Sequence, residues 1–329
     1  MRLLNSFREA FGFKDTIFYK ENSDLQDRYN ALKRLKEEYP NNEDILNEFY
    51  IVKKGLDGEN EIAYQLKKSN IGMYVLRDIK VKYDDLTAQI DYVIITPVFI
   101  YYVECKNLVG NITINEKGDF IRELNINGKK IRKGMYSPLT QVENQREVLR
   151  KIWENDTSKI TKLFASNWFD FYRRVLVVAA NHDTIINTDK APDYIKYKVL
   201  KADSLIRQIK YNYEHKGKNE FFESKKNMEK RAQAYLDISI KEDINYYDYY
   251  MNKYCNNVVI DDLKDRLIEL RKNRSSKMNI PAYYVFTNEE LDKLVELRPK
   301  TIEELANLNI LSEIKVKTHG EEIVKEIVK

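Results

Sequence analysis

Residues 89–107 read QIDYVIITPVFIYYVECKN and contain two apolar runs in succession. The first run begins with Asp91, and the second ends with Glu104 and Lys106. Side chains alternate along a strand, so Glu104 and Lys106 share one face while Cys105 lies on the other. If the two runs pair as a hairpin, Asp91 approaches Glu104 from the neighbouring strand. Two carboxylates and one ammonium on a sheet predict a site for a divalent cation and an activated water.

The same residues have an ordinary structural interpretation. Asp91 could be a turn residue ahead of a strand, and Glu104 could form a simple ion pair with Lys106. Burying a charge costs several kcal/mol per ion, so a structural ion pair is more favourable on a solvated edge than inside an apolar run. Both interpretations stay open on spacing alone.

Residues 57–70 have the spacing of an amphipathic helix. Ile62, Ala63 and Leu66 follow Glu59 at three, four and seven residues, which places Glu59 on the apolar face. The alternative is that Glu59 stabilises a helix N-terminus, a role that Glu61 could fill equally well.

Five ordered elements resemble the nuclease-related domain (NERD) of the PD-(D/E)xK nuclease superfamily. They are Gly58-Glu59, Gln89-Ile-Asp91, Glu104-Cys-Lys106-Asn107, Gly110-Asn-Ile112 and Pro138-Leu-Thr-Gln141. The resemblance covers about residues 50–210. There are two departures from the pattern: Ile90 stands where the superfamily has Pro, and Thr96-Pro-Val-Phe99 forms a connection where the family often has Gly.

The resemblance implies an α/β fold with a PD-(D/E)xK, or restriction-endonuclease-like, core, in which helices flank a central mixed sheet. It implies Mg²⁺-dependent hydrolysis of phosphodiester bonds in nucleic acid, with DNA as the expected substrate and Mn²⁺ as a substitute metal. The implied metal ligands are Glu59, Asp91, Glu104 and the backbone carbonyl of Cys105. The implied catalytic residues are Asp91, Glu104, Lys106 and Gln141. The implied contacts with nucleic acid in this region are Gln89 and Asn107.

Changes in pattern divide the chain into predicted segments. These are a helical lead-in at 1–55, the nuclease-like domain at 56–211, a helical connector at 212–258 and a helical domain at 259–329. Ser137 and Pro138 are typical of a helix start, and the helix is expected to reach about residue 155. The apolar run Val175–Ala180 predicts a buried central strand. Tyrosines between 246 and 254 could stack on bases, but packing between helices is the favoured interpretation.

The C-terminal segment resembles the HRDC domain, an all-α helical bundle found in certain helicases. The matching residues are Leu267, Arg271, Ile280-Pro-Ala282, Val285-Phe286, Leu291, Leu294, Pro299, Thr301, Glu304-Leu305 and Gly320. The family usually has a Gly-rich turn where this chain has residues 309–312. The resemblance implies nucleic-acid binding, with candidate phosphate contacts at Arg266, Arg271, Lys272 and Arg274. Residues 261–329 carry a net charge of −1, so a solvated helix face and a protein-docking role stay open.

Composition narrows the function classes further. The 329 residues carry a net charge of +4 and include two cysteines, too few for a disulfide framework or a zinc site. No G-x-x-x-x-G-K-[ST] motif occurs, which argues against an ATP-driven helicase. No run approaches the ~20 apolar residues that span a bilayer, so we expect a cytoplasmic protein without a membrane partner. The alternative functions are a non-catalytic nucleic-acid-binding platform and a protein-docking adaptor. A homodimer, or a protein partner at the HRDC-like domain, is also open.

Overall fold

The computed structural model describes residues 12–126, 128–156, 169–217, 220, 222–255, 263–278 and 280–328, without the side chain of residue 156. The chain divides into two compact units, Met1–Tyr250 and Met251–Lys329. The first unit is α/β, and the described part of the second is entirely helical. The expected fold class is therefore confirmed.

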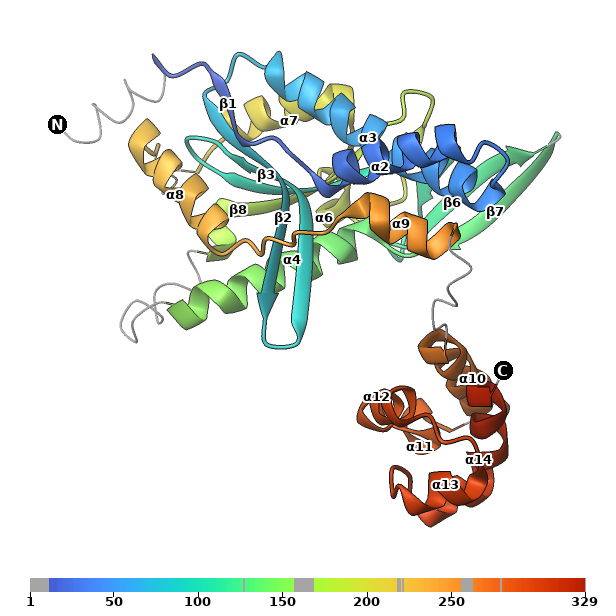
Figure 1. The fold of residues 1–329 in the computed structure, drawn as a ribbon. Coiled ribbons are helices and arrows are strands. Elements are labelled where there is room, and N and C mark those ends of the chain that lie inside the picture. Colours follow the sequence, from blue (N-terminus) through green and yellow to red (C-terminus); the bar gives the residue numbers. More distant parts are fainter. Residues whose placement is uncertain are drawn as a thin grey trace. The chain divides into compact units, whose positions relative to one another are not determined.

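A mixed six-stranded sheet forms the centre of the first unit (Figure 1). Its order is β1 (Thr16–Lys20), β2 (Met73–Tyr83), β3 (Leu86–Ile95), β4 (Ile100–Lys106), β8 (Arg173–Ala179) and β10 (Val199–Lys201). β2, β3 and β4 are antiparallel, whereas β1 is parallel to β2, and β8 is parallel to β4 and β10. The predicted strand at Val175–Ala180 is β8, and it lies between β4 and β10.

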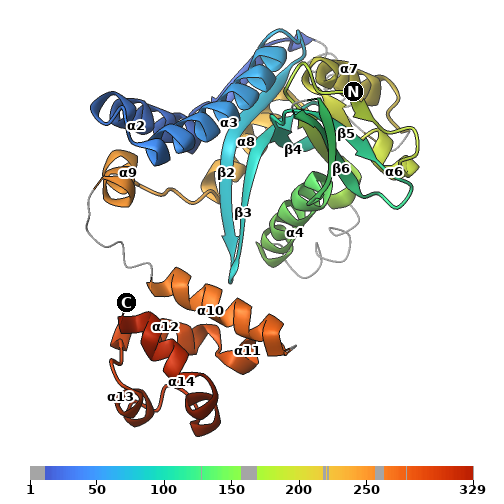
Figure 2. The same cartoon turned by 90° about the vertical axis from the view of Figure 1, so that its right-hand side faces the viewer.

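Helices cover both faces of this sheet (Figures 1 and 2). α4 (Pro138–Asp156) and α8 (Lys225–Asp237) pack on one face. α3 (Glu43–Lys67) and α7 (Ala202–Glu214) pack on the other. Alternation along β4 sends Ile100 and Tyr102 into the first core, and Tyr101 and Val103 into the second. Both faces of the strand are thus buried, as its continuous apolar sequence predicts.

A second sheet of four strands has the order β7-β6-β5-β9. Its strands are β5 (Asn111–Ile114), β6 (Phe120–Ile126), β7 (Lys129–Met135) and β9 (Ile186–Asn187), and α6 (Asp193–Lys196) follows β9. β6 and β7 form an antiparallel hairpin that runs outward at the edge of the first unit in Figure 1. The chain passes from β7 directly into α4, where Ser137 Oγ accepts a hydrogen bond from the Thr140 N–H at 3.1 Å. This contact confirms the predicted helix start.

The prediction of a wholly helical N-terminal segment is wrong, because Thr16–Lys20 forms strand β1 beside β2. Residues 1–11 of the predicted lead-in lie outside the described residues. After α2 (Asp24–Glu38), the end of the predicted lead-in and the predicted helix at 57–70 form one continuous helix, α3. Gly55 and Gly58 do not interrupt it. A Cβ on Gly58 would lie only 2.6 Å from Asn107 Cβ, so glycine there permits close helix–strand packing.

The predicted connector contributes to the first unit instead of standing apart from it. Met228, Ala232 and Tyr235 on α8 are buried in the same core as α4. In α9 (Tyr246–Tyr254), Tyr250 Oη accepts a hydrogen bond from Arg28 Nε on α2 at 2.7 Å. The packing interpretation of the tyrosine-rich segment is therefore confirmed.

The described part of the second unit is a helical bundle with its own core. It comprises α10 (Leu263–Met278), α11 (Ala282–Val285), α12 (Asn288–Leu297), α13 (Ile302–Asn307) and α14 (Glu313–Val328). Leu267, Phe286, Leu294 and Leu305 are fully buried in it. Asn309 adopts φ +50°, the left-handed conformation that a glycine would otherwise supply in this turn. Along the whole described chain, no helix combines the length and apolar character required to cross a membrane.

Candidate active site

Asp91 and Glu104 occupy adjacent strands where the β3–β4 ladder ends. The last pair of this ladder is Tyr92 with Val103. Beyond it, Oδ2 of half-buried Asp91 accepts a hydrogen bond from the Cys105 N–H at 2.7 Å. The predicted hairpin therefore forms and brings the two acidic side chains near each other. The turn that closes it needs no glycine, because the Thr96 side chain bridges its two ends.

Glu104 and Lys106 share the face of β4 that α4 covers. Glu104 is only 2% exposed, and its Oε1 accepts a hydrogen bond from Lys106 Nζ at 2.6 Å. The same ammonium donates to Gln141 Oε1 on α4 at 3.0 Å. Lys106 is thus held between the strand and the helix, in contact with one carboxylate and one amide.

Gln145 completes the polar group, although it was not predicted as a site residue. It lies one helical turn after Gln141, and its Nε2 donates to Glu104 Oε2 at 3.1 Å. Its other polar atom, Oε1, is buried without a hydrogen-bond partner. The i, i+4 spacing of two glutamines near the apolar stripe of a helix is the sequence signal that could have identified Gln145.

The surroundings of Asp91 disfavour its charged form. Burial raises the pKa of Asp91 well above its usual value, and the nearby carboxylates of Glu104 and Glu59 raise it further. The Cys105 N–H and Lys106 oppose this shift only in part. Burial also raises the pKa of the Cys105 thiol, which lies near Gly58 on α3, on the other side of the sheet from Glu104. The thiol is therefore not poised as a nucleophile.

Glu59 faces the core, as predicted, but it lies in the middle of α3 and not at a helix start. Its Oε2 accepts a hydrogen bond from Arg77 Nη2 at 3.0 Å, and both side chains are buried. Burial raises the Glu59 pKa, while Arg77 opposes that effect. Among the described residues, no three His, Cys, Asp or Glu side chains form a group able to hold a metal. Glu59 therefore lies near enough to Asp91 to raise the pKa of that carboxyl group, but its own hydrogen bond is to the cationic Arg77.

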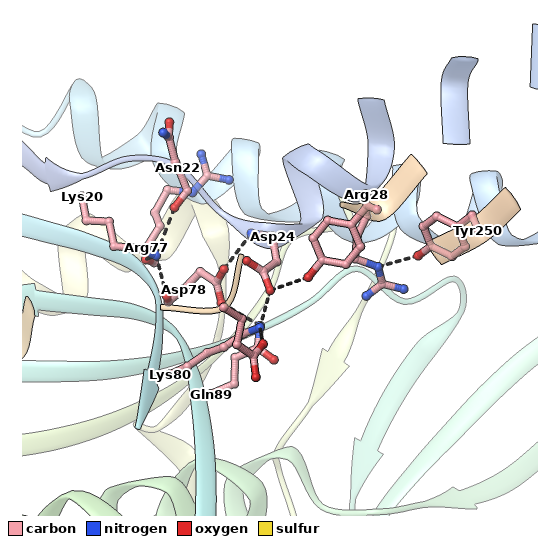
Figure 3. Close-up of polar contacts among 11 residues, drawn as sticks. Lys20, Asn22, Asp24, Arg28, Arg77, Asp78, Lys80, Gln89 and Tyr250 are labelled. Atoms are coloured by element: carbon pink, nitrogen blue, oxygen red, sulfur yellow. Dashed lines mark hydrogen bonds and ion pairs between the residues drawn. The ribbon is translucent and has the colours of Figure 1, made fainter. Parts of the chain in front are cut away.

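Gln89 belongs to a neighbouring polar network that joins β2 to α2 (Figure 3). Its Nε2 donates to Asp78 Oδ1 at 2.6 Å, and Asp78 Oδ2 accepts from the Asp24 N–H at 2.7 Å. Asp78 has φ +52° inside β2. Lys80 also pairs with Asp24, and Lys20 donates to the Asp78 carbonyl oxygen at 2.6 Å. These contacts place the Gln89 amide in a structural network, and a contact with nucleic acid stays a prediction.

Asn107 connects the candidate site to α3. Its Nδ2 donates to the Lys54 carbonyl oxygen at 2.7 Å, just beyond the end of β4. This hydrogen bond gives the Asn107 side chain a structural role that does not require nucleic acid. A contact of Asn107 with nucleic acid stays a prediction.

The arginines predicted as phosphate contacts in the second unit bind groups of their own domain. Arg266 Nη1 donates to the Glu326 carbonyl oxygen at 2.7 Å, and Arg271 Nη1 donates to Asn288 Oδ1 at 2.9 Å. Arg274 Nη1 lies 3.0 Å from Glu322 Oε1, and its Nη2 donates to the Thr318 carbonyl oxygen. The remaining member of the predicted set, Lys272, is exposed.

A more cationic surface lies on the β6–β7 hairpin. The two strands carry five Lys or Arg and one Glu, a net charge of +4, equal to the formal charge of the whole chain. Lys129, Lys130 and Lys133 are exposed, and no ion pair to them occurs within the described ranges. Arg132 Nε lies 3.0 Å from Glu123 Oε1. The run Lys-Lys-Ile-Arg-Lys at residues 129–133 is the sequence signal for this surface. The small net charge of the whole chain gives no indication of this local cluster.

Comparison with protein families agrees with the resemblances drawn from sequence. The model of the nuclease-related domain matches residues 54–178, which include β3, β4 and the whole of α4. The model of the HRDC domain matches residues 261–327. Comparisons with curated proteins and with solved structures returned no match. Residues 54–178 thus match the nuclease-related domain and residues 261–327 match the HRDC domain, in the order that the sequence predicts.

Proposed function

We propose that this protein is a metal-dependent nuclease that hydrolyses phosphodiester bonds at the β3–β4–α4 site. The observation that supports it most directly is the polar group around the buried carboxylate of Glu104. Lys106 and Gln145 bind this carboxylate, Gln141 binds Lys106, and Asp91 lies on the adjacent strand. A buried structural ion pair alone would not explain why Gln145 Oε1 is left without a partner.

The residues present fit a hard divalent cation. Asp91 and Glu104 supply oxygen ligands, and Gln145 Oε1 is a further oxygen near Glu104. Mg²⁺, or Mn²⁺ in its place, would stabilise charge on the phosphate and lower the pKa of a bound water. The Cys105 carbonyl and Glu59 stay predicted ligands, with Glu59 the less favoured because it pairs with Arg77.

The protein groups have separate tasks in this proposal. The Cys105 N–H orients Asp91, and Gln145 orients Glu104. Lys106 carries the positive charge that would neutralise an oxyanion on the phosphate, and Gln141 fixes the direction of its ammonium group. Asp91, Glu104, Lys106 and Gln141 are therefore the proposed catalytic group.

The β6–β7 hairpin is the proposed contact for the nucleic-acid backbone. Its three unpaired lysines offer charge to phosphates, and a two-stranded ribbon has dimensions that a DNA major groove admits. DNA is the proposed substrate on this basis. The HRDC domain, whose class binds nucleic acid, would add a second contact or dock a protein.

The test is cleavage of supercoiled plasmid, linear duplex, single-stranded DNA and RNA, with Mg²⁺, Mn²⁺ or EDTA. Wild type is compared with Glu104→Gln, Lys106→Ala and the control Glu143→Gln. Glu143 lies on α4 but pairs with Lys198 at 2.9 Å, away from the Glu104–Lys106 pair. Calorimetric titration with Mn²⁺ measures metal binding independently of turnover.

We expect metal-dependent cleavage in wild type and Glu143→Gln, and its loss in the other two variants. We also expect Glu104→Gln to lose Mn²⁺ affinity. Undiminished cleavage by folded Glu104→Gln would refute the assignment. Mn²⁺ and nucleic-acid binding without cleavage of any substrate would favour the non-catalytic platform instead.

A further inference from the structure

A cavity of about 160 Å³ lies between β4, α4 and α8, on the sheet face that also carries Glu104. Its walls are mostly apolar and include Leu149 and Trp153 from α4 and Phe169 from the segment before β8. The hydroxyls of Tyr102 and Tyr235, 2.6 Å apart, line it as well. The proposed nuclease chemistry uses none of these side chains.

The positive charge of Arg173 in this cavity has no described anionic partner. The side chain lines the cavity and is only 7% exposed. Within the described part of the chain, no carboxylate lies within ion-pair distance of it, and its Nε has no hydrogen-bond partner. Burying a cation without an anion is costly, so a guanidinium in this position calls for a compensating group.

The compensation that the protein supplies comes from neutral groups, and it includes hydrogen bonds between the guanidinium and the hydroxyls of Tyr102 and Tyr235. The guanidinium carbon lies 4.2 Å from the Phe169 ring centre and 5.4 Å from that of Trp153, and Nη1 donates to the Phe169 carbonyl oxygen at a long 3.5 Å. The sequence between α4 and Phe169, TSKITKLFASNW at 157–168, contains no Asp or Glu. Arg231 also lines the cavity, but Glu223 binds it through two nitrogens.

We propose that this cavity binds a small apolar carboxylate whose carboxylate group pairs with Arg173. The volume suits a benzene-sized body, since an apolar cavity of about 150 Å³ is known to hold benzene. The planar guanidinium matches a carboxylate through two parallel hydrogen bonds. One buried cation neutralises one negative charge, which favours a monoanion over a phosphate dianion. This binding site does not depend on the proposed nuclease function.

The test is isothermal titration calorimetry of the full chain with benzoate and with benzamide, its neutral analogue, at neutral pH. Arg173→Met removes the charge but keeps an apolar side chain of similar length. Arg174→Met is the matched control, because Arg174 is the next residue of β8, on the opposite sheet face, and pairs with Glu220 at 3.2 Å. Arg173→Lys keeps the charge without the planar fork.

We expect wild type and Arg174→Met to bind benzoate at least about tenfold more tightly than benzamide, because charge-assisted hydrogen bonds are about twice as strong as neutral ones. Arg173→Met should lose that preference, and Arg173→Lys should keep it with lower affinity. Equal affinity for the two compounds in wild type, or no binding of either, would overturn the proposal even if Arg173→Met fails to fold. A preference that survives in folded Arg173→Met would also overturn it.

Discussion

Replacing Lys129, Lys130 and Lys133 with glutamine tests whether the β6–β7 hairpin holds the nucleic-acid backbone. Each phosphate contact on B-DNA contributes about −0.9 to the slope of log affinity against log salt concentration, so three contacts contribute about −2.7. Over a roughly fourfold rise in salt, that slope amounts to about a fortyfold loss of affinity. Arg132 is left unchanged because Glu123 already pairs with it. The variant should therefore bind more weakly at low salt and should lose less affinity as salt rises.

The assay is fluorescence anisotropy of a labelled DNA duplex titrated with the protein at several salt concentrations. EDTA is present throughout to prevent cleavage. Lys210, Lys226 and Lys230, which are exposed on α7 and α8, provide a control with the same change of charge. A slope unchanged by the hairpin substitutions, or reduced equally by the control, would refute the proposed contact. Aggregation of the hairpin variant with an unchanged slope would instead indicate that the lysines protect an exposed edge strand.

Three further predictions concern separate parts of the molecule. Gln145→Leu should weaken Mn²⁺ binding by about 10–100-fold, as measured by calorimetry, because it removes the amide that orients Glu104; unchanged affinity would contradict this role. Asp78→Ala should lower the free energy of unfolding in urea by about 2–4 kcal/mol, because it removes two charge-assisted hydrogen bonds and keeps a left-handed backbone; a loss under about 0.5 kcal/mol, the usual size of a surface substitution, would contradict it. Burial and then Arg274 lower the pKa of His319 below its usual 6.5. The contribution of neutral His319 to the free energy of unfolding should therefore be complete above pH 6.5 and lost as the pH falls through the lowered pKa. An NMR titration of His319 with a midpoint at or above 6.5 would contradict the direction of this pKa shift.

The sequence predicted the elements whose local signals agree with their tertiary surroundings. β4 has the bounds expected from its apolar run, and α4 begins at the Ser-Pro pair. The hairpin that brings Asp91 to Glu104 follows from two adjacent β-like runs, and alternation alone places Lys106 beside Glu104. These features depend on periodicity and on neighbours close in sequence.

Features that depend on distant segments were not predictable in the same way. β1 is five residues long and becomes a strand through pairing with β2, more than fifty residues later. The predicted helix began at residue 57, yet α3 begins at Glu43, and Gly58 within it allows Asn107 to approach closely. The ion-pair partner of Glu59 is Arg77 on β2, and no spacing in the sequence predicts this pairing. Long-range contacts of this kind decide which charged residues are structural and which are available for chemistry.

The position of α4 has a thermodynamic consequence. Its first half carries Gln141 and Gln145 against Glu104 and Lys106, and its second half carries Leu149 and Trp153 on the wall of the Arg173 cavity. A ligand that moved this one helix would alter the geometry around Glu104 as well. Linkage is reciprocal: if a carboxylate in the cavity changed metal affinity by some factor, the metal would change carboxylate affinity by the same factor. Each of the two sites would thus report on occupancy of the other.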